Sequence, residues 1–85
     1  MKQFNYTITD ELGIHARPAG MLVKTVTPFQ SKVTIDTGAK KADARRIMAV
    51  MGLGVKQGAE LTFTVEGPDE DAAAEALETF LKANL

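Results

Sequence analysis

The sequence has no cysteine among its 85 residues, and histidine occurs only once. Without cysteine, a disulfide framework and a thiolate metal site are both excluded. A single histidine leaves only scattered carboxylates as metal ligands, so we expect no metal centre and no cofactor. The chain also lacks the apolar run of a signal peptide and any apolar run long enough to cross a bilayer. These absences predict a cytoplasmic chain without membrane insertion.

The sequence also has no large excess of basic or acidic residues. Ten Lys and Arg stand against eleven Asp and Glu, which gives a formal net charge of -1. That balance argues against a general nucleic-acid binder. The basic residues gather in the first half and middle, and the acidic ones in the C-terminal segment, which predicts a basic side suited to an acidic partner. An apolar content of 45% over this length fits one small domain, residues 1–85.

Periodicity of the apolar residues predicts four strands and three helices. Alternation predicts strands over residues 2–8, 32–36, 40–43 and 61–66. Helical spacing predicts helices over residues 16–27 and 47–52 and a long last helix with Asp69 as its N-cap. The resulting order is βαββαβα. Because the strands are apolar at alternate positions only, we expect an α+β open-faced sandwich, a four-stranded antiparallel sheet with three helices packed on one face.

The single histidine lies in the stretch Gly-Ile-His-Ala-Arg-Pro, residues 13–18. Pro18 suits a first helical turn, so the pattern puts His15 at or just before a helix start. Helix N-terminal amides have no internal partner and attract anions, and the same field favours a neutral, nucleophilic imidazole. Arg17 adds a guanidinium that matches phosphate oxygens. Together these groups predict a phosphoryl acceptor.

Residues 13–19 resemble the active-site signature of the histidine-containing phosphocarrier (HPr) family of the bacterial phosphoenolpyruvate:sugar phosphotransferase system. Residues 46–54 resemble that family's second signature, and the likeness covers essentially the whole chain. The resemblance implies that His15 takes a phosphoryl group on Nδ1 from enzyme I and passes it to IIA domains of sugar-specific enzymes II. It also implies that Arg17 stabilises the phosphoryl group, with Ala16 and Pro18 at the helix N-terminus, and that the chain is a carrier rather than an enzyme.

The resemblance further implies a partner-binding surface on the first two helices. Its members are Gly20, Met21, Lys24, Arg45, Arg46, Ile47, Met48, Met51 and Gly52. The sequence alone leaves two explanations open for the methionines, core filling or an adaptable exposed patch. Helical spacing puts Ile47, Val50 and Met51 on one side of the short helix. We expect a monomer.

Three alternatives compete with the carrier prediction. An RNA-binding module has a similar layout, but the strand aromatics share phase with the core positions and so cannot stack bases. A regulatory paralogue without transfer activity would lack the histidine that this chain keeps. A carrier of the nitrogen-related branch has similar residues and stays open. In many Gram-positive members a regulatory serine precedes Ile47, but here that residue is Arg46, so we predict no serine switch; the only serine is Ser31.

Overall fold

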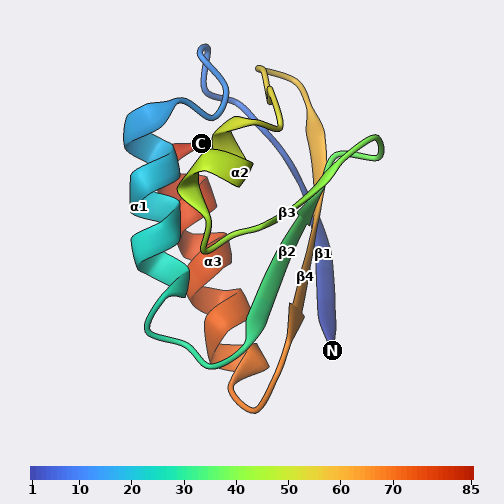
Figure 1. Ribbon diagram of the computed structural model, residues 1–85, viewed down its shortest axis with the longest axis vertical. Helices are drawn as coiled ribbons and strands as arrows, with labels where there is room; N and C mark the ends of the chain where they lie inside the picture. Colours follow the sequence, from blue (N-terminus) through green and yellow to red (C-terminus); the bar gives the residue numbers. More distant parts are fainter.

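The order of helices and strands follows the periodicity of the sequence. The computed structural model describes all of residues 1–85. Its elements are β1 Lys2–Thr7, α1 Ala16–Val26, β2 Lys32–Asp36, β3 Lys41–Asp43, α2 Ile47–Met51, β4 Glu60–Glu66 and α3 Glu70–Asn84 (Figure 1). The predicted order βαββαβα is confirmed, including the short strand β3. None of the three helices has both the length and the apolar character that crossing a membrane requires.

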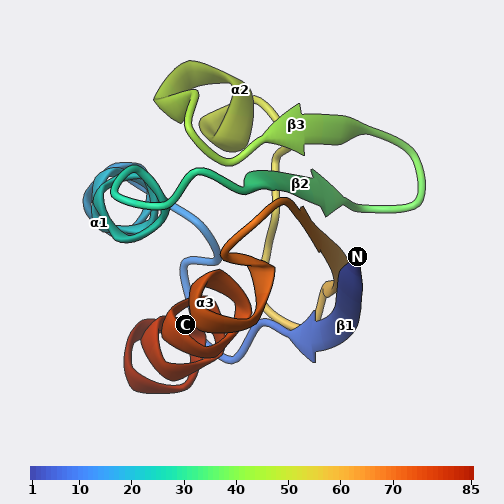
Figure 2. The same ribbon diagram turned by 90° about the horizontal axis from the view of Figure 1, so that it is seen from below.

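The strands form one antiparallel sheet in the order β1-β4-β2-β3. Strand β4 is central, so Phe63 pairs with Phe4 on one side and with Ile35 on the other. Helices α1 and α3 lie side by side over one face of the sheet, and α2 lies next to β3 and α1 (Figure 2). The predicted open-faced α+β sandwich is therefore confirmed.

The hydrophobic core fills the space between the sheet and the helices. Inward positions of β2 and β4 are fully buried together with residues of α1 and α3: Val33, Ile35, Leu61, Phe63, Val65, Leu22, Val26, Leu77 and Leu81. Phe4 stacks on Phe63 with ring centroids 5.3 Å apart. The Tyr6 hydroxyl donates to the Leu81 carbonyl of α3 at 2.9 Å. The aromatic residues of the strands thus lie on the covered face, as their phase predicts.

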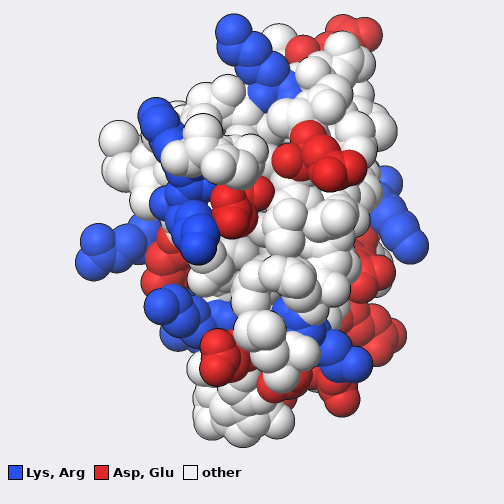
Figure 3. Space-filling view, turned by 90° about the vertical axis from the view of Figure 1, so that its right-hand side faces the viewer, with Lys and Arg blue, Asp and Glu red and all other residues white.

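The opposite face of the sheet is polar. Figure 3 looks onto this side and shows basic and acidic side chains interspersed rather than gathered by sign. The Thr62 hydroxyl donates to the Asn5 side chain at 2.9 Å across neighbouring strands. Because the strand aromatics point the other way, this face has no platform for stacking bases. The RNA-binding alternative therefore lacks its main structural requirement.

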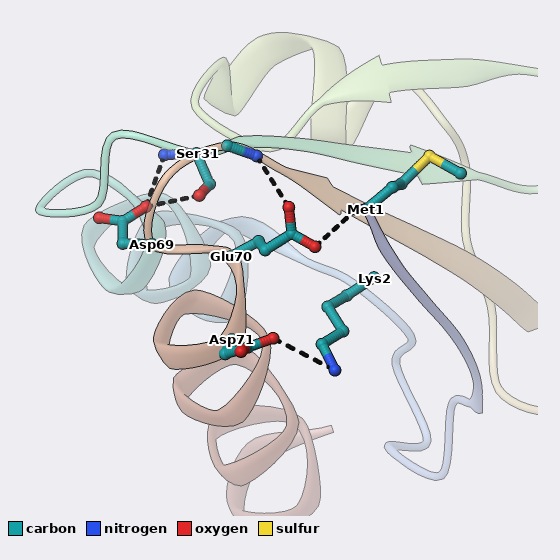
Figure 4. Close-up of polar contacts among 7 residues, drawn as sticks. Met1, Lys2, Ser31, Asp69, Glu70 and Asp71 are labelled. Carbon is teal, nitrogen blue, oxygen red and sulfur yellow. Dashed lines mark hydrogen bonds and ion pairs between the residues drawn. The ribbon is translucent and has the colours of Figure 1, made fainter.

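The start of α3 confirms the predicted N-cap residue, but the contacts of its side chain lie elsewhere. Asp69 occupies the N-cap position, but its side chain makes no capping hydrogen bond to its own helix. Instead, its carboxylate accepts hydrogen bonds from the Ser31 hydroxyl at 2.5 Å and from the Ser31 main-chain amide at 2.9 Å (Figure 4). It also accepts the main-chain amide of Gln30 at 2.9 Å. The hydrogen bond from the Ser31 hydroxyl, followed by that from the Gln30 amide, lowers the pKa of Asp69. Asp69 therefore joins α3 to the loop before β2.

The next two residues of α3 hold the start of the chain. The Met1 amino group is 2.6 Å from a Glu70 carboxylate oxygen, and the Lys2 ammonium is 3.2 Å from Asp71 (Figure 4). Pairing with the Met1 amino group lowers the pKa of Glu70. Both acidic side chains also lie in the first turn of α3, where the helix dipole favours negative charge.

Candidate functional site

The loop between β1 and α1 is fixed by a close approach of backbone to backbone. Gly13 has a φ of 69°, and a Cβ atom there would lie 2.1 Å from the Val55 carbonyl oxygen. The next amide, that of Ile14, donates to the same oxygen at 3.2 Å. Only glycine fits at this approach. The contact positions the chain just before His15.

His15 is the N-cap residue of α1, as predicted. Its backbone is extended, with φ -109° and ψ -178°, and its carbonyl accepts the first helical hydrogen bond from the Ala19 amide at 2.9 Å. The side chain does not cap the helix. It is 39% exposed, so the imidazole ring is accessible to another molecule.

Donor groups without partners surround the start of α1. The amides of Ala16 and Arg17 donate no hydrogen bond within the chain, and Pro18 has no amide proton to place. The Arg17 side chain is exposed and makes no hydrogen bond or ion pair with the rest of the chain. No acidic residue lies in the first turn to occupy these donors. The arrangement can therefore bind a small dianion, such as a phosphoryl group, beside His15.

Asp10 was missed by the sequence analysis. Its Oδ1 atom lies 3.7 Å from Nε2 of His15. The same oxygen accepts the Leu12 amide at 2.8 Å, an Asx turn that fixes the carboxylate in the loop. An Asp in a loop can predict an Asx turn. The turn alone does not indicate that the carboxylate would face the imidazole.

Comparison with known proteins identifies the family. The family described as the PTS HPr component phosphorylation site matches residues 2–83. The chain belongs to the HPr family. The phosphocarrier protein HPr of Lysinibacillus sphaericus is 52% identical to it over 81 residues, which cover 95% of this chain and 92% of that relative. A solved histidine-containing phosphocarrier protein described for Mycoplasma has a TM-score of 0.94 at 36% identity, covering 96% of this chain and 93% of that one. The resemblance stated from the sequence is confirmed.

A regulatory relative is also similar to this HPr-family chain. Crh, a Bacillus subtilis catabolite-repression protein, has a TM-score of 0.78 at 33% identity, covering 100% of this chain and 98% of that one. Its structure is described as a swapped-domain dimer. Because the identity to the named phosphocarrier of Lysinibacillus sphaericus is 52%, against 33% to Crh, the regulatory alternative is not favoured.

Helices α1 and α2 meet where the partner-binding surface was predicted. The position that a Cβ of Gly20 would take is 3.7 Å from Cδ1 of Ile47, so α2 packs directly over this glycine. We call the nine predicted residues the α1–α2 surface: Gly20, Met21, Lys24, Arg45, Arg46, Ile47, Met48, Met51 and Gly52. All are exposed except Gly20, which is half-buried. The structure thus brings them together on two neighbouring helices and the ends of α2.

The apolar residues of α2 differ in part from the expectation. Ile47, Val50 and Met51 were predicted to share one side of the helix, but only Val50 is buried. Ile47 and Met51 are 39% and 37% exposed, and Met48 is 76% exposed. A helix of five residues against one edge of the sheet can bury only a single position. Of the two explanations left open for the methionines of α2, the structure therefore supports the exposed patch.

The two arginines before α2 have different surroundings. Arg45 donates from its guanidinium to the Phe29 carbonyl and, at 3.5 Å, to the Ser31 carbonyl. It therefore helps to hold the loop before β2. Arg46, the N-cap residue of α2, is exposed and its side chain has no partner within the chain. Arg46 is thus the more available of the two for another protein.

Proposed function

We propose that this chain is a phosphocarrier that accepts a phosphoryl group on His15 from phospho-enzyme I and passes it to IIA domains of the sugar phosphotransferase system. The observation that carries the proposal is the exposed His15 ring at the start of α1, beside two unpaired amides and the unpartnered Arg17.

The proposed transfer uses each of these groups. A ring nitrogen of His15 attacks phosphorus, the N–P bond forms, and the bond to the donor breaks with its electron pair leaving on the donor. Charge spreads over the equatorial oxygens during transfer, where the Arg17 fork and the amides of Ala16 and Arg17 can donate to them. Pro18, the third residue of α1, has no main-chain N–H and so leaves no unpaired donor at that position. Exposure of the ring allows the same step to run in reverse toward an acceptor.

The α1–α2 surface is the proposed docking site for both donor and acceptor. Its exposed methionines offer adaptable apolar contact, and Arg46 and Lys24 add positive charge at its edge. We propose that residues 1–85 act as one domain, as a monomer, in the cytoplasm. The monomer proposal is distinct from the swapped dimer described for Crh, and size-exclusion chromatography with light scattering decides between them.

The function is tested by incubating the purified chain with phosphoenolpyruvate and a catalytic amount of enzyme I. We expect a gain of one phosphoryl group by intact mass, lost in mild acid because phosphohistidine is acid-labile. His15→Ala should fold normally and gain nothing. Labelling that survives in His15→Ala, or that resists acid, would contradict the assignment to His15. Replacing enzyme I by its nitrogen-branch counterpart tests the second candidate, since the residues do not separate the two branches.

A further inference from the structure

Asp10 lies beside Nε2 of the His15 ring, whereas the family resemblance implies that the phosphoryl group is carried on Nδ1. The Asp10 carboxylate is the only acidic group of the chain that pairs with His15, at 3.7 Å from Nε2. That separation is an ion-pair distance, longer than a hydrogen bond. Because the carboxylate faces Nε2, the nitrogen that remains available to an electrophile is Nδ1.

The Asp10 carboxylate is held in place from several directions. Its Oδ1 accepts the Leu12 amide at 2.8 Å, and its main-chain carbonyl accepts the Gly13 amide at 3.0 Å. Its own amide donates at 3.0 Å to the Leu85 main-chain oxygen, which also accepts the amide and hydroxyl of Thr9 at 2.5 and 2.8 Å. Leu85 itself is buried. The end of α3 therefore fixes the loop that carries Asp10, and the carboxylate is preorganised beside the ring.

We propose that Asp10 is the counter-ion of the phosphorylated His15 ring, a positioning residue that acts through His15. The proposal rests on the function proposed above. When the Nδ1 lone pair forms the bond to phosphorus, the donor leaves with the electrons of the broken bond and Nε2 keeps its proton. The ring thereby gains a positive charge. The phosphoryl oxygens add negative charge at Nδ1, on the other side of the ring from Asp10, where Arg17 and the helix amides can pair with it. Asp10 faces the positive ring through Nε2, 3.7 Å away, so the nearer charge dominates and Asp10 favours the phosphorylated state over the free one.

The size of the effect follows from the exposure of the pair. The side chains of His15 and Asp10 are 39% and 27% exposed, so water screens much of their attraction. Partly exposed ion pairs change an equilibrium by about two- to fivefold, and salt weakens them. Asp10 also favours the tautomer of free His15 that carries its proton on Nε2, which leaves Nδ1 unprotonated for attack.

The matched variants are Asp10→Asn and Glu11→Gln. Asn keeps an oxygen that can accept the Leu12 amide but removes the charge, and Asp10→Ser is a second neutral variant that can also form the turn. Glu11 is exposed, is the neighbouring acid and forms no ion pair with His15, so Glu11→Gln removes an equal charge elsewhere. Thermal unfolding first identifies which of the neutral variants retain the wild-type fold.

The experiment is a competition for phosphoryl groups. An equimolar mixture of 15N-labelled wild type and one variant receives limiting phosphoenolpyruvate with catalytic enzyme I at pH 7.5, where imidazole side chains are mostly neutral. Intact mass at equilibrium gives the share of phosphoryl groups on each. We expect wild type to hold about two- to fivefold more than Asp10→Asn or Asp10→Ser, with less difference in 0.5 M salt, and an equal share against Glu11→Gln.

Two results would overturn the proposal. One is an equal share between wild type and both neutral Asp10 variants; the other is a loss in Glu11→Gln as large as in Asp10→Asn. Nitrogen-15 shifts of the free His15 ring supply an independent readout, and we expect a larger Nδ1-protonated population in Asp10→Asn. Failure of wild type to take up any phosphoryl group would instead refute the proposed function, so the two failures are distinguishable.

Discussion

Replacing Gly20 with alanine should make the folded chain more stable. Glycine inside a helix costs about 1 kcal/mol relative to alanine, and Gly20 lies in the middle of α1. The new Cβ would lie 3.7 Å from Cδ1 of Ile47, an ordinary van der Waals contact, so no steric cost offsets the gain. For a domain of this size, about 1 kcal/mol raises Tm by roughly 4–8 °C. Calorimetry and urea unfolding measure both quantities.

Gly38 provides the matched control for this prediction. No atom lies within 4 Å of the Cβ position at Gly38, so it has more room than Gly20. Its φ is 93°, however, a backbone conformation that alanine disfavours. Gly38→Ala should therefore lower the free energy of unfolding by about 1 kcal/mol, although nothing obstructs the methyl group. A destabilised Gly20→Ala, or a Gly38→Ala that is stabilised equally, would refute the reasoning.

The Gly20 variant also tests the α1–α2 surface. A methyl group at residue 20 stabilises the helix, but it lies beside Ile47 on the proposed docking surface, where it would obstruct a partner that approaches closely. We expect Gly20→Ala to accept phosphoryl groups more slowly from enzyme I, and at the wild-type rate from the small donor phosphoramidate. Equal slowing with both donors would place the defect at His15 and contradict a docking role.

Three further predictions concern individual side chains. Arg17→Lys should slow transfer from enzyme I in a stopped-flow assay, since a point charge replaces a planar fork; an unchanged rate would remove Arg17 from the transfer step. The rate of transfer from enzyme I should fall with added salt, and it should fall less steeply in Arg46→Ala if Arg46 steers an acidic partner. Equal salt dependence in the two proteins would count against a steering role for Arg46. Because hydrogen bonds lower the pKa of Asp69 in the folded state, its contribution to stability is complete above the ordinary Asp value of about 3.9 and is lost as pH falls through the lower folded value. Asp69→Asn should therefore flatten the acid limb of the stability profile in denaturant titrations, and an unchanged limb would contradict this.

The fold could be predicted from the sequence because its signals are local. Alternating apolar residues mark β2 and β4, and the spacing of Leu22 and Val26 marks α1. Even the three-residue strand β3 follows from the turn before it. The N-cap position of Asp69 was predicted correctly, but its side-chain partners could not be predicted, because Ser31 and Gln30 lie in a loop far away in the chain.

The candidate site could be predicted only where its groups are neighbours in sequence. His15 and Arg17 belong to one helix start, so residue type and position suffice. The pairing of Asp10 with His15 depends on the path of the loop between β1 and α1. Contacts with Val55 and Leu85, which are distant in the sequence, fix that path. The exposure of Ile47 and Met51 depends on how little of the sheet α2 covers, and helical periodicity does not contain that information.

The central claim is that His15 carries a phosphoryl group between two proteins. Its most direct test is single-turnover discharge: the chain is phosphorylated, freed of enzyme I and phosphoenolpyruvate, and mixed with a purified IIA domain, with the masses of both proteins followed in time. The account predicts that each phosphoryl group lost from this chain appears on the IIA domain, at a rate far above spontaneous hydrolysis. A phosphorylated chain that loses its group only to water, at the same rate with or without the IIA domain, would contradict it.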